Sequence, residues 1–498
     1  MPDHKSSVLN GFRLFLNFFV QWHGLCVYCS CLVKIEFIKE EITMSETIRE
    51  QVLKARAAFD AIADYTQEQV DKLVYEVGRI IYMNAELLAE MAVNETGLGD
   101  VQEKIGKNET VGAVFWEYLK DKKSVGIINT VPDKEGLIKV AHPVGVIATI
   151  TPATNPTVTP LGNFMHGLKG KNAMIVSPAP RAQKTTEETV RFMREALVKY
   201  GAPADLIQVV QETTIQKSQE LMASCDLVIA TGSMGLTKAA YSSGTPAYGV
   251  GPGNTPAIID RGYDKKHAAE LSLLAVVGDN GMLCDGDNLL LYPDDEETET
   301  FAALREAGIA VFEDAEDVDR FRKTIFAEDG SLNSGLVGKH AYKIADAAGI
   351  SLPKDAKVIG LKVDAIGSAE ILCKEIMSPV VILKSYDTFE NAVAMAKQNM
   401  VEAGGVGHTG GVFTDNMDHV LYASERIPVS RLLINQPTPD AWGPATNGLA
   451  PAVSEGCGTW GNNIISENVN YTHMINISRT AMPLDVEVRT PAEVFGDK

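Results

Sequence analysis

Cysteine is scarce in most of this chain. Seven of the 498 residues are Cys, and beyond residue 45 only four remain, far apart in the sequence. These four are Cys225, Cys284, Cys373 and Cys457. Such widely spaced cysteines do not form the dense disulfide framework of small secreted proteins, so we expect free thiols in a reducing cytoplasm.

Positive charge is also in short supply. The chain has 45 Lys and Arg against 65 Asp and Glu, which gives a formal net charge of -20 and a pI of about 5.0. This balance argues against nucleic acid or an anionic membrane as a partner. It does not exclude anionic cofactors, because local backbone N–H groups and single cations hold these.

The first 43 residues differ in composition from the rest. Residues 8–38 are apolar, aromatic and Cys-rich, but polar residues interrupt the run and no clean signal-peptide cleavage site follows. The interrupting residues are Arg13, Gln21, His23 and Lys34. His23, Cys26, Cys29 and Cys31 lack the second ligand pair of a zinc finger, so no metal site is predicted.

A different origin explains this segment better. The stretch IKEEITM, which ends at Met44, can be encoded by a purine-rich run of the kind that forms a bacterial ribosome-binding site. We therefore expect translation of a bacterial protein to start at Met44. Residues 1–43 are then a non-native or disordered extension.

Beyond residue 44 the hydrophobic pattern changes along the chain. Apolar residues recur at spacings of three and four from 45 to 108, which predicts helices. Strand-like runs then alternate with helical segments, which predicts an α/β protein with parallel, doubly wound sheets. The strand-like runs are LIKVAHPVGVIATIT, NAMIVSP, LIQVV, LVIATG and PAIIDRG, and from Asn288 NLLLYP, AVFED and VVILKSY. Among the predicted helices are 184–200, 296–306, 334–349 and 387–398.

Two strand-end loops have the residue types of a nucleotide site. ATGSMG (230–235) ends a strand and begins a helix, so free N–H groups near Gly232, Ser233 and Gly235 suit a phosphate. It is not the G-x-G-x-x-G fingerprint, and an ordinary glycine turn is an equal alternative. In SPAPRA (177–182), Ser177 and Pro178 end a strand and Arg181 follows. Ser177 suits a ribose and Arg181 a phosphate, although a loop arginine is more often only solvated.

Two further positions suit carbonyl chemistry. Asn155 in TPATNP follows a strand and precedes a proline, where a carboxamide can donate to an oxyanion or simply start a turn. Cys284 lies in GDNGMLCDGD, just before an apolar strand. A lone cysteine is usually a small buried hydrophobe, so Cys284 is a nucleophile only if the other groups accompany it.

Together these pieces, in this order, resemble the aldehyde dehydrogenase superfamily. The resemblance covers residues 45 to about 480 and is closer to the CoA-acylating branch, such as the aldehyde half of bifunctional aldehyde–alcohol dehydrogenases. The motifs that carry it are TNP (154–156), SPAPRA, ATGSMGLTKAAYSSGTPAYGVGPGNTP (230–256), DNGMLC, KEIMSPV (374–380), GVGHTGG (405–411) and LAPAVSEGCGTWGNNIISENV (449–469).

The resemblance implies a fold and a function for each domain. It implies two doubly wound parallel-sheet lobes plus an oligomerising strand segment. The expected parts are an NAD(P)-binding domain at 44–254, a catalytic domain at 255–435, and a segment at 436–498. That last segment would line the cleft, return to the cofactor domain and support a homodimer or homotetramer.

The same resemblance assigns roles to residues. Cys284 becomes the nucleophile that forms a thiohemiacetal and then a thioester, with Asn155 and the Cys284 backbone N–H on the oxyanion. Glu375 would hold the nicotinamide ribose. His408 would assist proton transfer or position CoA, with a purely structural histidine as a near-equal alternative. Val250 falls where hydrolytic members carry a glutamate base, so CoA rather than water would remove the acyl group.

Cofactor and substrate follow in outline. The resemblance implies NAD or NADP, with CoA as co-substrate, and Arg181 is a possible partner for a 2′-phosphate. The aldehyde is short, either acetaldehyde or sulfoacetaldehyde, and Arg431 is a candidate cation for a sulfonate. Alternatives are an acyl-phosphate reductase, an aldehyde dehydrogenase that does not use CoA, and a non-catalytic member of a shell or filament. We expect a bacterial cytoplasmic enzyme, free or associated with a microcompartment.

Overall fold

The structure is a computed structural model that describes residues 46–352 and 356–496. The predicted extension at 1–43 lies outside these residues. None of the helices within the described ranges is long and apolar enough to cross a membrane.

Within the described residues four helices precede the first strand, as the helical periodicity predicted. Thr66 and Gln69 form a capping box that starts the second helix, and Asp100 caps the fourth by accepting from Gln102 N and Glu103 N. Gly97 ends the third helix in the left-handed region, with φ 67°. The helices are α3 (Glu46–Ala61), α4 (Gln67–Met83), α5 (Ala85–Thr96) and α6 (Val101–Leu119).

A parallel five-stranded sheet follows, and it confirms the first predicted lobe. The strand order is β5-β4-β3-β6-β7, so the chain reverses direction along the sheet between β3 and β6. In such sheets ligands bind beyond the carboxyl ends of the strands at that switch point. The strands are β3 (Val146–Thr151), β4 (Ala173–Pro178), β5 (Ile207–Val209), β6 (Leu227–Thr231) and β7 (Ala247–Val250). The helices between them are α7 (Val158–Lys169), α8 (Gln183–Lys199), α9 (Ile215–Ser224) and α10 (Met234–Tyr241).

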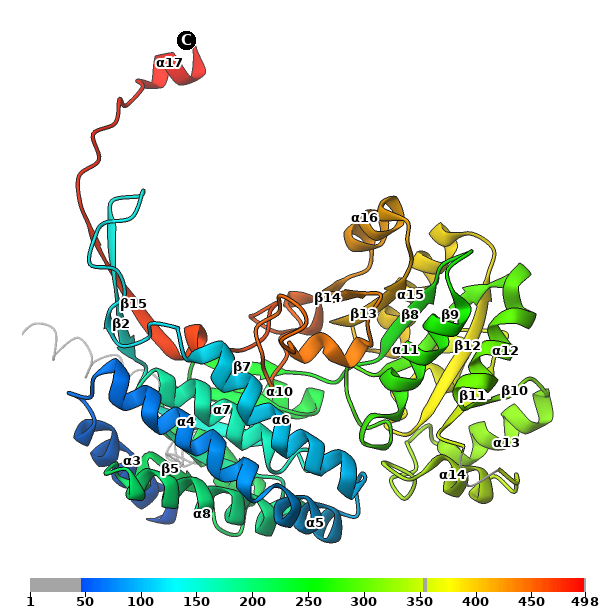
Figure 1. Cartoon of the computed structure of the whole chain (residues 1–498), viewed down its shortest axis with the longest axis horizontal. Coiled ribbons are helices and arrows are strands. Elements are labelled where there is room, and N and C mark those ends of the chain that lie inside the picture. The colour runs from blue at the N-terminus through cyan, green and yellow to red at the C-terminus, as the bar shows by residue number, and fades with distance from the viewer. Residues whose placement is uncertain (1–45, 353–355, 497–498) are drawn as a thin grey trace, which may run out of the picture. The chain divides into compact units, whose positions relative to one another are not determined.

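A seven-stranded parallel sheet forms the second lobe, in the order β10-β11-β12-β9-β8-β13-β14. Leu289 and Leu291 of β9 pack on one side with α13 to α16, whereas Leu290 and Tyr292 pack on the other with α11 and α12. Helices therefore cover both faces of this sheet, as a doubly wound lobe requires (Figure 1). The strands are β8 (Thr255–Ile259), β9 (Asp287–Pro293), β10 (Ile309–Phe312), β11 (Val358–Lys362), β12 (Val380–Tyr386), β13 (Gly407–Phe413) and β14 (Val429–Ile434). The helices are α11 (Lys265–Val277), α12 (Glu297–Ala307), α13 (Ala315–Ile325), α14 (Ala341–Ala347), α15 (Phe389–Ala403) and α16 (Met417–Arg426).

A small antiparallel sheet, β1-β2-β15, completes the architecture. It contains β1 (Gly126–Ile127), β2 (Leu137–Pro143) and β15 (Ile475–Ala481), and a short helix α17 (Pro491–Phe495) follows. β15 pairs with β2 from Ile475↔Pro143 to Ala481↔Leu137, so the C-terminal segment returns to the region of the first sheet (Figure 1). The predicted fold of two parallel lobes plus a strand segment is confirmed.

One predicted strand is in fact two. LIKVAHPVGVIATIT divides into β2 and β3, which belong to different sheets. Gly145 lies between them with φ 124°, and a Cβ there would lie 2.3 Å from the Asp226 carboxylate. The chain therefore turns at a position that only glycine fits, and the apolar run on both sides hides the turn.

Candidate active site

Three loops converge at Cys284. They are 251–254 after β7, 278–286 after α11, and 373–379 before β12. A Cβ on Gly253 would lie 1.6 Å from the Cys284 carbonyl oxygen, and one on Gly281 would lie 2.2 Å from the Ser378 carbonyl carbon. Glycine at these two positions therefore lets the backbones of the three loops touch.

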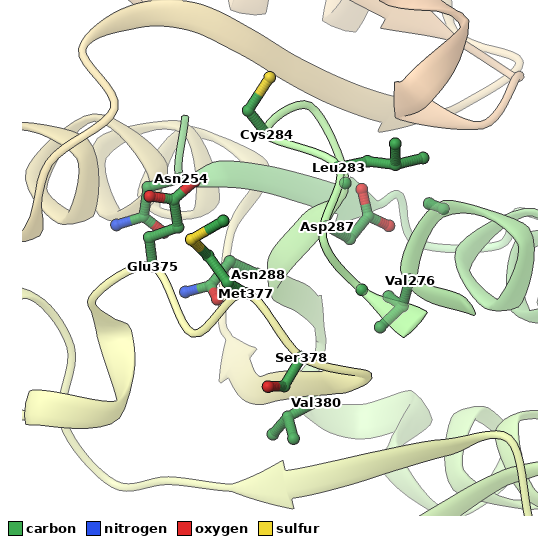
Figure 2. A pocket seen from close by; sticks show the side chains of 13 residues that line it. Asn254, Val276, Leu283, Cys284, Asp287, Asn288, Glu375, Met377, Ser378 and Val380 are labelled. Carbon is green, nitrogen blue, oxygen red and sulfur yellow. The ribbon is translucent and has the colours of Figure 1, made fainter. Parts of the chain in front are cut away.

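The loops line a pocket that is partly open to solvent (Figure 2). Cys284, Glu375 and Asn254 are among the residues that line it. Figure 2 shows that the Cys284 sulfur points away from Ser378 and Val380 at the far end of the pocket. The thiol therefore lies where a ligand reaches it from outside the packed loops.

The Cys284 thiol is exposed to solvent although protein surrounds it closely. The close packing of protein around the thiol raises its pKa well above the ordinary value, and the nearby acids Glu455 and Glu375 raise it further. In the free protein the neutral thiol is therefore the favoured form. An exposed thiol suits the nucleophile that the resemblance implies, but its activation needs a change in local charge or a base.

A strained turn fixes the start of the Cys284 loop. Asp279 and Asn280 have φ of 48° and 56°, in the left-handed region that disfavours residues with a side chain. The Asp279 carboxylate is buried and pairs with Lys104 Nζ at 2.8 Å and Lys107 Nζ at 2.7 Å. The two ion pairs hold the loop against α6 and offset the backbone strain.

Lys107 also connects this turn to Asn155. Its Nζ donates to Asn155 Oδ1 at 3.2 Å, whereas Lys104 Nζ donates to the Thr154 carbonyl at 2.8 Å. Because Oδ1 accepts from Lys107, the Nδ2 of the Asn155 carboxamide points away from this lysine. The predicted oxyanion donor is thus oriented by a lysine that the sequence reasoning did not identify.

Glu375 lies across the pocket from the first lobe's loops. Its carboxylate accepts from the Gly253 backbone N–H, and burial raises its pKa to about 7. Asn254 Nδ2 donates to the Cys373 carbonyl at 2.8 Å, and Asn288 Nδ2 donates to the Lys374 carbonyl at 3.1 Å. These two contacts fix the backbone of the loop that carries Glu375.

A buried polar cluster lies beside the nucleophile and contains two acids that the sequence reasoning missed. Asp285 and Glu455 are 5% and 7% exposed and lie within hydrogen-bonding reach of each other. His408, predicted from the sequence, is 1% exposed, and its Nε2 lies 3.9 Å from Glu455 Oε2. Burial and the neighbouring Arg431 lower the His408 pKa well below its usual value, so this ring is neutral.

The structure contradicts the proposed role of Arg431 in holding a sulfonate. Arg431 is 3% exposed, and its guanidinium donates to the carbonyls of His408 and Gly456, both at 2.9 Å. It also donates to Asn468 Oδ1 at 3.2 Å. Because Arg431 is buried and most of its donors bind acceptors inside the protein, it is poorly placed to hold a sulfonate.

The predicted cofactor residues are at the carboxyl edge of the first sheet. Gly232, Ser233 and Gly235 surround the start of α10, where Ser233 Oγ caps the helix by accepting from Leu236 N. Pro178 ends β4 and is buried, while Arg181 is exposed and donates one nitrogen to the Thr96 carbonyl at 2.7 Å.

Ser177 does not fit the ribose contact proposed for it. Its side chain is fully buried and its hydroxyl pairs with Ser218 Oγ at 2.8 Å.

Val250 ends β7 and is 2% exposed. This position, where a hydrolytic member would have a carboxylate, is thus apolar and buried in this protein.

Comparisons with known proteins agree with this arrangement. The model of the aldehyde dehydrogenase family matches residues 38–308 and 362–448. The chain is 44% identical over 452 residues to the succinate-semialdehyde dehydrogenase (acetylating) of Clostridium kluyveri, covering 90% of this chain and 99% of that protein. It is 35% identical to the sulfoacetaldehyde dehydrogenase (acylating) of Bilophila wadsworthia, and the match covers 91% of this chain and 98% of that protein. The crystal structure of an acetylating aldehyde dehydrogenase from Geobacillus thermoglucosidasius superposes with a TM-score of 0.84 at 34% identity, covering 89% of this chain and 98% of that one. The chain therefore belongs to the aldehyde dehydrogenase family of oxidoreductases and groups with its CoA-acylating members.

Proposed function

We propose that this protein oxidises a short-chain aldehyde to its acyl-CoA through a thioester on Cys284, and catalyses the reverse reduction. The observation that carries the proposal is the exposed Cys284 thiol at the junction of three tightly packed loops, with the apolar Val250 at the position of a hydrolytic base. Two of the relatives carry acylating or acetylating in their names, which supports CoA as the acyl acceptor.

The residues divide the reaction between them. Cys284 loses its proton and adds to the aldehyde carbonyl, and Asn155 Nδ2 with the Cys284 N–H stabilises the oxyanion. When bound, NAD(P) accepts the hydride and CoA supplies the thiol that takes the acyl group. The loss of hydride converts the Cys284 adduct into a thioester. Val250 activates no water, so the thioester persists until CoA arrives.

The cofactor is held by residues of both lobes. The exposed turn at Gly232, Ser233 and Gly235 would hold the pyrophosphate at the start of α10, next to the switch point between β3 and β6. Glu375 would accept from the nicotinamide ribose hydroxyls. Arg181 has free nitrogens for a 2′-phosphate, which supports use of NADP as well as NAD.

The division into domains and the assembly are part of the same proposal. Residues 44–254 would bind the cofactor and residues 255–435 would carry Cys284. Residues 436–498 would line the cleft and join a second copy in a homodimer or homotetramer. A link between the last segment and the first lobe supports this: Ser454 Oγ lies 2.7 Å from Thr231 Oγ1. A cytoplasmic location stays a prediction.

An initial-rate assay tests the proposal. NAD(P)H formation is followed with acetaldehyde, propanal, sulfoacetaldehyde and succinate semialdehyde, with and without CoA, with NAD and with NADP. We expect CoA-dependent NAD(P)H formation with an acyl-CoA product, and no formation by Cys284→Ser, which should still bind cofactor. Free acid without CoA contradicts the acylating reaction. A requirement for phosphate indicates an acyl-phosphate reductase, and no turnover with any aldehyde indicates a non-catalytic protein.

A further inference from the structure

The cluster beside Cys284 limits which aldehydes fit. If the proposed function holds, the aldehyde carbon bonds to the Cys284 sulfur, so the rest of the substrate lies within a few bond lengths of it. Asp285 is the next residue in the chain, and the charge of Glu455 raises the pKa of the Cys284 thiol, which places both acids near the sulfur although neither is among the residues that line the pocket. The groups on these two residues are therefore part of the surroundings of the substrate chain.

Glu455 offers a buried acceptor that has no donor. Its Oε2 is buried and makes no hydrogen bond within the described chain. The nearest cationic atom is Arg431 Nε at 3.6 Å, and His408 Nε2 is at 3.9 Å, both beyond hydrogen-bond distance. Buried acceptors are almost always satisfied in folded proteins, so this oxygen requires a donor from a ligand or a water.

The protonation states of Asp285, Glu455 and His408 determine which kind of ligand group Glu455 Oε2 can accept from. Burial and the charge of Glu455 raise the Asp285 pKa well above its usual range, so Asp285 keeps its proton and donates to Glu455. Burial also raises the Glu455 pKa, but the charge of Arg431 and the hydrogen bond from Asp285 oppose this rise, so Glu455 is the charged member of the pair with Arg431 as its counter-ion. His408 is neutral, and the Arg431 donors point at backbone carbonyls. Four hydrogen bonds within the protein use most of the Arg431 donors, whereas the buried Glu455 Oε2 is free to accept from a donor.

We propose that the preferred aldehyde carries a hydrogen-bond donor, a hydroxyl or ammonium group, on its chain, and that Glu455 Oε2 accepts from it beside Cys284. A carboxylate or sulfonate at the same place would be a second buried negative charge next to Glu455, with no cation free to pair with it. The site thus selects hydroxy- or aminoaldehydes over aldehydes with an anionic tail.

Near-isosteric substrate pairs test this selection. kcat/KM is measured for glycolaldehyde against propanal, and for 3-hydroxypropanal and 3-aminopropanal against butanal, with succinate semialdehyde and sulfoacetaldehyde as anionic members. We expect kcat/KM for the preferred donor-bearing aldehyde to exceed that for its alkyl counterpart by about 10-fold to 100-fold, which is the range for a hydrogen bond to a charged group. The aminoaldehyde arm separates ammonium from hydroxyl. In Glu455→Gln this advantage should fall to about threefold or less, because the acceptor loses its charge.

Glu467→Gln is the matched control, because Glu467 belongs to the same segment but its side chain is 69% exposed. It should leave the preference unchanged. The proposal is overturned if an anionic aldehyde gives the highest kcat/KM, or if Glu455→Gln keeps the wild-type preference. Absence of CoA-dependent turnover with every aldehyde contradicts the proposed function instead, so the two failures are distinct.

A second measurement needs no variant and no turnover. The rates at which iodoacetamide and iodoacetate alkylate Cys284 are compared with the same ratio for free glutathione. The amide offers N–H donors and the acetate carries an anion of similar size. We expect the protein to favour iodoacetamide at least tenfold more than glutathione does, as a donor to a charged acceptor implies. An equal ratio contradicts the proposal.

Discussion

Lys107→Met should lower catalysis by removing the group that orients Asn155. Lys107 Nζ donates to Asn155 Oδ1 at 3.2 Å, and no other hydrogen bond to that oxygen occurs within the described chain. Without it the carboxamide rotates freely and Nδ2 is aimed at the oxyanion only part of the time. Methionine keeps the length of the side chain and removes only the charge and the donors.

The size of the effect follows from the geometry. A hydrogen bond from a charged donor is worth about 1.5–3 kcal/mol. The Lys107–Asn155 distance is at the long end of the usual range, so the lower value of about 1.5 kcal/mol applies, which is about tenfold in rate. Asn155→Ala removes the donor itself and should cost about 10²–10³ in kcat. The kcat of Lys107→Met should therefore lie clearly between that of the wild type and that of Asn155→Ala.

Lys104→Met separates orientation from stability. Both lysines pair with Asp279 Oδ2, so each variant leaves that buried carboxylate with one partner and the two should lose similar thermal stability. Only Lys107 contacts Asn155, because Lys104 donates to the Thr154 carbonyl. Steady-state kinetics and thermal melts of both variants decide the question. Equal losses of kcat in the two variants, or no loss in Lys107→Met, would refute the orienting role.

Three further predictions follow from the charges and burial of single side chains. Because the Cys284 pKa is raised above 9.0, its alkylation in the free protein should still accelerate above pH 9.0, measured by mass spectrometry of its peptide, and a plateau at lower pH would contradict the assignment. Arg181→Ala should raise the KM for NADP more than that for NAD, since only NADP has a 2′-phosphate; equal changes would show that Arg181 does not bind that group. Burial raises the pKa of Asp287 to about 7, so the stability it contributes is complete below about pH 4 and is lost as the pH rises to about 7. Asp287→Asn, which keeps the acceptor for Thr438 Oγ1, should therefore raise the melting temperature at pH 8 but not at pH 4, and a uniform change would contradict the shift.

The sequence predicted the strands β3 to β6 of the first sheet and β8, β9, β10 and β12 of the second, because buried parallel strands are short apolar runs that stand out between helices. It missed β7, β11, β13 and β14, and β13 is rich in glycine and not in apolar residues. The sequence also did not show turns that interrupt a regular hydrophobic pattern. The predicted helix 334–349 is reduced to α14 (Ala341–Ala347), and Gly338 in the lost part has φ 65°. The left-handed turn at Gly338 is set by packing, since a Cβ there would lie 2.5 Å from Met282 Sδ in the Cys284 loop.

The site was predictable only where a motif names the residue. Cys284, Asn155 and Glu375 came from motifs, and the structure places Cys284 and Glu375 on one pocket. Asp285 and Glu455 had no such signal, because an acid in a loop is usually solvated and only folding brings these two together. Arg431 failed as a ligand cation for a related reason: the sequence shows a charge but not the carbonyls that surround it.

The survival of the thioester on Cys284 has a structural reason beyond the missing base. Of the acids near the thiol, Asp285 keeps its proton and so accepts none from water. Glu375 is held by the Gly253 N–H. Glu455 Oε2 accepts from the substrate chain in the proposal above, so a bound acyl group and not a water occupies it. A base needs an ionised oxygen aimed at a water beside the acyl carbon, and these contacts leave no such oxygen in the acylated enzyme.

Val250→Glu should restore such a base from the opposite side. Val250 ends β7 immediately before the loop that touches Cys284, and its 2% exposure means that a glutamate there is poorly hydrated and has a raised pKa. A carboxylate with a pKa nearer neutrality is a better base at neutral pH. We expect the share of aldehyde recovered as free acid to rise relative to acyl-CoA, measured by product analysis at limiting CoA, with Val250→Gln as the uncharged control. If the glutamate variant folds, as judged by its melting temperature, and still gives only acyl-CoA, then the access of water rather than the lack of a base protects the thioester.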